Sequence, residues 1–156
     1  MQSRNTQVMF YLLEDENLAT ANDIGSLFHC ACLQAAYFYR QKQKVFIYTK
    51  DQDKAHDIDE MLWTFNANSF VPHNLQGEGP SYGSAVEISW QNPTGRRPVL
   101  INLTDTAPDF SGQFSRVIDF VPSDEVLKQS ARERFKAYRQ LGFEVGNQPF
   151  PASESA

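Results

Sequence analysis

Residues 8–49 read VMFYLLEDENLATANDIGSLFHCACLQAAYFYRQKQKVFIYT, and this stretch decides the fold. It opens on the uninterrupted apolar run Val8–Leu13, which is typical of a buried strand. From about Ala19 to Gln41, apolar residues recur at steps of three and four, which predicts a helix that is apolar on more than one side. The β-branched and aromatic run Val45–Thr49 then predicts a second strand. This order indicates a βαβ unit with parallel strands.

The following segments continue the same alternation. Asp51 or Asp53 is expected to cap a second helix that runs to about Trp63. The stretch Ser69–Gly83 is rich in glycine, proline and asparagine, which predicts a long loop. Three more apolar or alternating runs predict strands: Ala85–Trp90, Val99–Leu103 and Val117–Val121.

A last helix and a tail complete the predicted organisation. Ser123–Glu125 supplies cap residues and acids for the start of a helix, and Gly142 is its expected stop. We therefore predict one α/β domain over residues 1–143, with a mostly parallel, Rossmann-like central sheet flanked by helices. Residues 144–156 hold two prolines and end on small or polar residues, which predicts a flexible C-terminal tail.

Composition narrows the class of protein. The 156 residues are 41% hydrophobic and 13% aromatic, which is too apolar for a disordered chain. The formal net charge of −5 argues against broad contact with phosphate backbones, although it leaves room for a local basic patch. Because Cys30 and Cys32 would lie about 200° apart on a helix, they cannot pair with each other. Two free thiols, together with the lack of a long apolar run, predict a cytoplasmic protein away from membranes.

The usual signatures of nucleotide binding and catalysis are missing. Three acids, Glu14-Asp15-Glu16, follow the first strand where a glycine-rich phosphate loop would lie. Gly77-Glu78-Gly79 is an isolated Gly-x-Gly, and His73 with Glu78 offers too few ligands for zinc. We therefore expect no catalytic residues, no metal and no cofactor.

The last helix carries a stripe of cations. Lys128, Arg132, Phe135 and Arg139 fall within about 60° of one another at 100° per residue. One interpretation is a solvated face in which Glu125 pairs with Lys128. A second is a docking strip for an acidic, partly apolar peptide, and a third is a phosphate-binding strip.

Aromatic residues also gather around the end of the second predicted helix. Met61, Leu62, Trp63 and Phe65 close that helix, and Phe70 opens the following loop. They cap the core in one interpretation and form a protein interface in the other.

Several blocks of the sequence resemble one family, the chi subunits of bacterial DNA polymerase III holoenzyme. The resemblance runs in order from Val8 to about Phe143. Its blocks are Phe10–Leu13, Ser69–Leu75, Gly77–Pro80, Val86–Ile88, Asp119–Pro122 and Leu127–Arg139. It implies a non-catalytic accessory protein with a nucleotide-binding-like fold that binds no nucleotide.

The resemblance also implies two partners and their sites. One partner is the psi subunit, which tethers chi to the clamp loader, and its site corresponds to Trp63 and Phe70. The other is the acidic, Phe-ending tail of single-stranded-DNA-binding protein, whose site corresponds to four residues: Val121, Lys128, Arg132 and Phe135. Arg139 extends this set because it lies on the same stripe. The family can carry Tyr at the position of Phe135, so one hydroxyl hydrogen bond is lost here.

The sequence thus predicts a bridge between psi and the single-stranded-DNA-binding protein, with no direct nucleic-acid contact. The alternative is a nucleotide-binding or nucleic-acid-binding α/β protein that uses the basic C-terminal helix.

Overall fold

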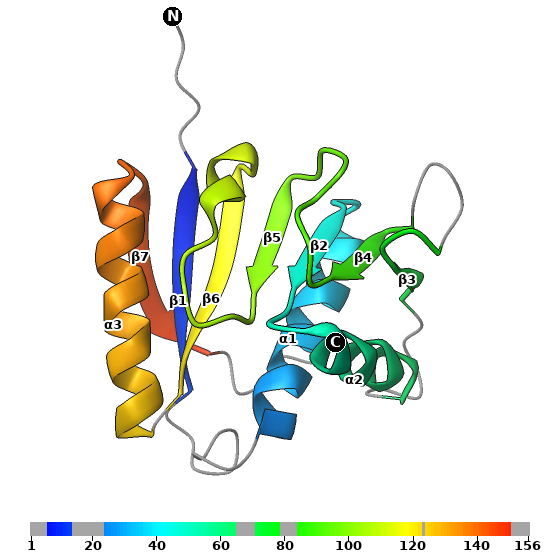
Figure 1. The fold of residues 1–156 in the computed structure, drawn as a ribbon, viewed down its shortest axis with the longest axis horizontal. Coiled ribbons are helices and arrows are strands. Elements are labelled where there is room, and N and C mark those ends of the chain that lie inside the picture. The colour runs from blue at the N-terminus through cyan, green and yellow to red at the C-terminus, as the bar shows by residue number, and fades with distance from the viewer. Residues whose placement is uncertain (1–5, 14–23, 65–70, 79–83, 123, 151–156) are drawn as a thin grey trace, which may run out of the picture.

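The computed structural model describes residues 6–13, 24–64, 71–78, 84–122 and 124–150, without the side chains of 24–26. One seven-stranded sheet has the order β3-β4-β2-β5-β6-β1-β7, and every neighbouring pair is parallel (Figure 1). The predicted parallel α/β sheet is therefore confirmed. The elements are β1 (Gln7–Leu13), α1 (Ile24–Arg40), β2 (Val45–Tyr48), α2 (Gln52–Thr64), β3 (His73–Leu75), β4 (Val86–Ser89), β5 (Val99–Asn102), η1 (Asp109–Gln113), β6 (Arg116–Pro122), α3 (Glu125–Gln140) and β7 (Glu144–Pro149).

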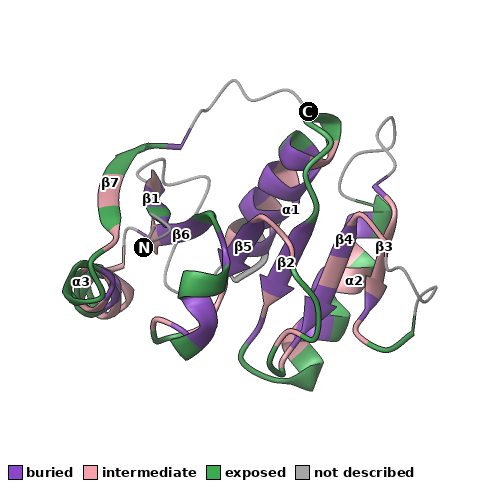
Figure 2. Cartoon of the chain, turned by 90° about the horizontal axis from the view of Figure 1, so that it is seen from above, coloured by how far each residue is buried: buried purple, intermediate pink, exposed green. Residues whose placement is uncertain are grey.

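Helices cover both faces of the sheet (Figure 2). On one face, α1 and α2 pack over a large core that includes Ile47, Ile101 and Ile118. On the other, α3 and η1 cover a smaller core around Phe10 and Phe46. Because successive strand residues point to opposite faces, neighbouring residues such as Phe46 and Ile47 serve different cores. No helix among the described residues is long and apolar enough to cross a membrane.

Helix α1 is buried on more than one side, as its sequence predicts. Phe28, Ala31 and Ala35 of the apolar stripe are buried, and so are Cys30 and Cys32. Both cysteines are free and fully shielded from solvent. Burial raises the pKa of the Cys30 thiol to about 12, and burial with the neighbouring Cys30 raises that of Cys32 further.

The ends of α2 and α3 follow the predicted cap residues. The Asp51 carboxylate accepts a hydrogen bond from the Lys54 amide at 2.9 Å, and that of Asp124 accepts from Leu127 at 3.1 Å. Gly142 follows α3 with a φ of +88°, a left-handed conformation that glycine adopts without strain.

Two strands lie where the sequence predicts none. Residues His73–Leu75, inside the predicted loop, form β3 at one edge of the sheet, too short to show a pattern. The prediction of a tail from residue 144 is wrong for Glu144–Pro149, which form β7 beside β1. An edge strand tolerates Pro149, and Phe150 anchors the end with its ring 5.5 Å from that of Tyr11. Pairing with β1 therefore outweighs a weak local preference. Residues 151–156 lie outside the described part.

We predict that both cysteines are inert in the folded protein. Native chain mixed with an aromatic disulfide reagent should release almost no thiolate at neutral pH, because buried thiols with raised pKa values react slowly. The unfolded chain should release two equivalents. Rapid reaction of either thiol before unfolding would contradict the packing of α1.

Candidate partner-binding surfaces on α3 and α2

A buried ion pair fixes α3 against the sheet. Asp119 lies in the middle of β6 and is 1% exposed, while Arg134 of α3 is 7% exposed. The Arg134 Nη2 donates to Asp119 Oδ1 at 2.9 Å, and its Nε donates to Oδ2 at 3.0 Å. Nη2 also donates to the Phe120 carbonyl at 3.1 Å. This forked geometry sets the rotation of α3 about its own axis.

Two neutral side chains complete the network around Asp119. The Tyr138 hydroxyl donates to Asp119 Oδ2 at 3.1 Å, and Asn102 at the end of β5 donates to the same oxygen at 3.3 Å. Burial, and next the Asp119 charge, raise the pKa of Tyr138 well above its ordinary value. Burial alone would lower the pKa of Arg134, yet Asp119 raises it above its ordinary range. Both side chains therefore keep their protons, and the network holds its charges in place.

The patterns in the sequence did not predict this network. The available signal was the spacing of Ala131, Arg134 and Tyr138, which places the arginine on the buried face of α3. An acid at the centre of an apolar strand, Asp119, also requires a buried partner.

We predict that Arg134→Met destabilises the protein by about 3–5 kcal/mol, because it leaves the Asp119 carboxylate buried without its partner. Urea unfolding followed by circular dichroism measures the change. Arg132→Met, two residues away on the exposed side of the helix, should change stability by less than about 1 kcal/mol. Equal effects of the two substitutions would show that Asp119 does not depend on Arg134.

With α3 held in this rotation, the predicted stripe lies along its exposed side. Arg132 is exposed, and its Nη1 donates to the neutral Oε1 of Gln129 at 3.1 Å. The Nζ of Lys128 lies 3.6 Å from Oε2 of the exposed Glu125. The ion pair expected for a solvated face is therefore present at Lys128. The flanking Lys136 lies 3.9 Å from Glu133. Arg132 thus keeps a charge that no acid among the described residues neutralises.

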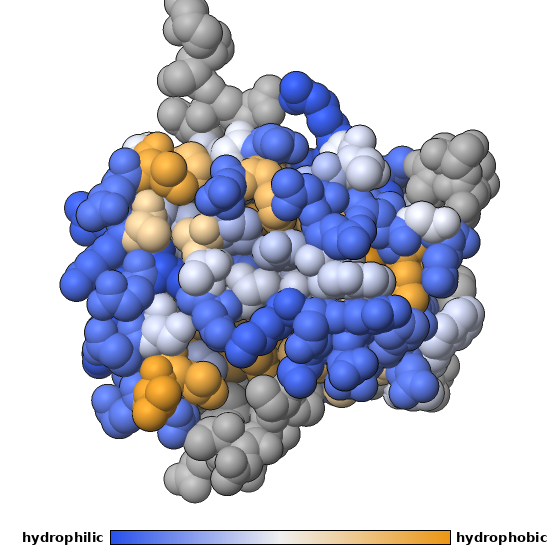
Figure 3. Space-filling model, in the orientation of Figure 1, coloured by the Kyte–Doolittle hydropathy of each residue, from blue (hydrophilic) through white to orange (hydrophobic). Residues whose placement is uncertain are grey.

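Two apolar residues, one from α3 and one from β6, line the inner border of the stripe. Phe135 is half-buried, with its ring 5.4 Å from that of Phe10. Val121 is half-buried near the end of β6 and packs against the same core as Phe135. Arg139 is exposed in the last turn of α3. Hydrophilic residues cover most of the outer side of the helix, and hydrophobic residues lie at its two ends (Figure 3).

A cavity of about 100 Å³ lies on the other side of α3, among residues that the stripe does not share. It lies at the carboxyl ends of β5 and β6, where α/β sheets usually bind ligands. Asp119 and Arg134 line it, but their charges satisfy each other, and Lys50 lies 3.0 Å from Asp105. The acidic residues after β1, Glu14–Glu16, lie outside the described residues.

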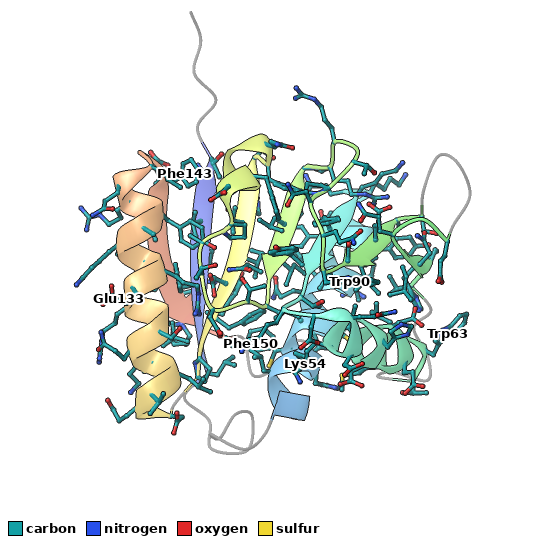
Figure 4. The ribbon with its side chains drawn as sticks, in the orientation of Figure 1. Lys54, Trp63, Trp90, Glu133, Phe143 and Phe150 are labelled. Atoms are coloured by element: carbon teal, nitrogen blue, oxygen red, sulfur yellow. The ribbon has the colours of Figure 1, made fainter. Side chains whose placement is uncertain are left out.

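The aromatic surface of α2 is present in part. Trp63 is 60% exposed near the end of α2, and its ring stacks edge-on against His73 of β3 at 4.9 Å. The His73 Nδ1 hydrogen-bonds the Val71 carbonyl at 2.7 Å, and Asp59 lies 3.4 Å from Nε2. Phe70 lies outside the described residues. Trp63 and the Glu133 side of α3 lie at opposite ends of the molecule (Figure 4).

Within the described residues, no group of three or more His, Cys, Asp or Glu side chains is arranged to hold a metal ion. The fold and these surfaces define an α/β protein with helices on both faces of an all-parallel sheet. Its distinctive exposed features are the cationic stripe on α3 and an aromatic corner formed by Trp63 against His73. Both are kinds of surface that contact other macromolecules.

Comparison with known proteins identifies the family. The model of the family described as "DNA polymerase III chi subunit, HolC" matches residues 6–146. The chain is 44% identical to DNA polymerase III subunit chi of Escherichia coli K12, over 87% of this chain and 92% of that protein. It is 42% identical to the subunit of the same name from Haemophilus influenzae, over 89% and 94%. The chain therefore belongs to the DNA polymerase III chi subunit family, whose members are accessory subunits in DNA replication.

A solved structure supports the fold alone. Phage T4 UvsW superposes with a TM-score of 0.61 at 12% sequence identity, over 93% of this chain and 41% of that chain. At this identity the match shows only that the two chains share an arrangement of strands and helices.

Proposed function

We propose that this chi-family protein bridges two partners without catalysing a reaction itself. The exposed side of α3 binds the acidic C-terminal tail of single-stranded-DNA-binding protein, and the aromatic corner at Trp63 binds the psi subunit. The resemblance to chi subunits motivates both partners. The placement of Trp63 and Glu133 at opposite ends of the molecule supports simultaneous binding, because the two partners would not overlap (Figure 4).

The exposed guanidinium of Arg132 carries the proposal for α3. Its hydrogen-bond acceptor is the neutral Gln129 amide, so a carboxylate can replace that amide with a gain in charge attraction. Lys128 adds a second cation, and its pairing with Glu125 is exposed and easily exchanged. Phe135 and Val121 offer apolar surface beside these charges for a terminal phenyl ring.

The expected affinity is modest. A charged hydrogen bond contributes about 1.5–3 kcal/mol and burial of a phenyl ring a similar amount. Ordering a flexible tail costs about 2–5 kcal/mol and offsets much of this gain, so we expect a weak complex, with a dissociation constant in the micromolar range or above. Weak contacts suit a DNA strand that is coated with many copies of single-stranded-DNA-binding protein. The many tails together supply avidity, while each single contact exchanges rapidly.

The decisive experiment is a titration with a short acidic peptide that ends in Phe, with a free or an amidated carboxyl terminus. The free acid should bind measurably tighter in calorimetry, since Arg132 or Lys128 contacts the terminal carboxylate. Added salt should weaken the complex. Equal affinities for the free acid and the amide would show that the terminal carboxylate does not contact these cations.

We predict that Arg132→Ala weakens binding of this peptide about tenfold, the loss expected for one charged hydrogen bond at an exposed site. The matched control is Arg96→Ala, which removes an exposed cation from the loop before β5. Calorimetry should show that the control binds like the wild type. If Arg132→Ala binds normally, the tail site lies elsewhere.

We predict that Trp63→Ala impairs binding of psi and leaves binding of the tail peptide intact. A ring that is 60% exposed contributes little to the core, so its loss should affect the interface more than the fold. Co-purification with psi measures the first effect and peptide calorimetry the second. Normal recovery of the psi complex with this variant would place the psi site on another surface.

A further inference from the structure

Cations that are scattered in the sequence gather at the amino ends of the strands. Arg40 ends α1, and Lys42 and Lys44 lie in the turn between α1 and β2. The loop before β5 carries Arg96, and Arg116 begins β6. All five side chains are exposed. We call these five residues the basic edge. Figure 2 views the sheet from this end, where the strands begin.

Backbone hydrogen bonds hold the three segments of the basic edge together. The Val99 amide donates to the Lys44 carbonyl at 3.3 Å, and the Arg116 amide donates to the Pro98 carbonyl at 3.1 Å. Val45, Val99 and Arg116 occupy one rung across β2, β5 and β6. Neighbouring strands are about 4.8 Å apart, so the cations spread over roughly 10 Å of the sheet edge.

Three of the five cations, Lys42, Arg96 and Arg116, form no ion pair with an acid among the described residues. The Nε of the half-buried Arg97 lies 3.6 Å from Glu87 Oε1, and its Nη1 donates to the Ser84 carbonyl at 2.8 Å. This arginine therefore stabilises the fold. Glu144 starts β7 in the same rung and accepts a hydrogen bond from Gln7 at 3.3 Å.

A polar groove opens beside the basic edge. It has a volume of about 480 Å³ between α1 and the strands β6, β1 and β7, and Arg116 forms part of its wall. Tyr37 is 40% exposed on the groove. The amide oxygen of Gln34, a residue 3% exposed in the wall, has no hydrogen-bond partner among the described residues. The other amide side chains of the wall are Gln41, Gln43 and Gln148.

We propose that the basic edge and this groove bind single-stranded nucleic acid. Lys42, Arg96 and Arg116 neutralise phosphates, and the ring of Tyr37 stacks with a base. Amide side chains both donate and accept, which matches the edges of bases. An acidic peptide fits less well, because its side-chain carboxylates are acceptors only and offer the Gln34 oxygen no donor.

This site is separate from the proposed tail site. Lys128 and Arg132 lie in the first half of α3, toward the carboxyl ends of the strands, whereas the basic edge lies at the amino ends. The sequence predicted no direct contact with nucleic acid because the net charge is −5. The local concentration of cations becomes visible only when β2, β5 and β6 are placed side by side.

The test is fluorescence anisotropy of a labelled, mixed-sequence single-stranded DNA oligonucleotide with the full chain, over a range of salt concentrations. Three neutralised phosphates predict a slope of about −2 for the logarithm of the binding constant against that of the salt concentration. Arg96→Ala combined with Arg116→Ala should weaken binding severalfold at low salt and reduce the slope by about 1.4. Tyr37→Ala should weaken binding with the slope unchanged.

The matched control is Lys128→Ala combined with Arg132→Ala, which removes the same charge from α3 and should leave DNA binding within twofold of the wild type. Thermal melting verifies that each variant is folded. No binding by the wild type at low salt, or equal losses in the two double variants, would overturn the proposal. So would displacement of the DNA by an acidic peptide at a lower concentration than by unlabelled DNA. None of these results bears on the tail-peptide titration, which measures binding at the proposed tail site on α3.

Discussion

The Asp119–Arg134 pair is the interaction on which the useful surfaces of this protein depend. A charged pair that is almost fully buried gains little net stability over an apolar pair, but it tolerates only one geometry. Here that geometry joins the middle of β6 to the middle of α3. It directs Arg134 inward, so Lys128, Arg132 and Arg139 must point outward and Phe135 must lie at the border.

Periodicity was sufficient to predict most of the fold. The runs at Val8–Leu13 and Val45–Thr49 are long and apolar enough that burial decides their structure, and the helix between them keeps its stripe through Phe38. The two missed strands, β3 and β7, lie at the two edges of the sheet. Each has a neighbour on one side only, so the partner strand, rather than its own residues, determines its conformation.

The candidate sites differ in the same way: some follow from local sequence patterns, and others depend on neighbouring elements. The stripe on α3 follows from helical spacing alone, which a sequence displays directly. Arg134 belongs to the same helix, yet its role depends on Asp119, fifteen residues away on another element. The basic edge depends on still longer separations, since Lys42 and Arg116 approach each other only through the register of β2, β5 and β6. Local patterns predict faces of single elements, whereas clusters across elements require the topology.

Parallel topology also brings these scattered cations to one end of the sheet. Every strand begins at one end of the sheet and finishes at the other, so each type of connection collects at one end. Lys42, Arg96 and Arg116 lie in connections or strand starts at the amino end, while Asp51, Asp105 and Asp124 lie in connections at the carboxyl end. A chain of net charge −5 thus presents a cationic edge without any long basic run in its sequence. A ligand approaching within a screening length responds to that edge and not to the total charge.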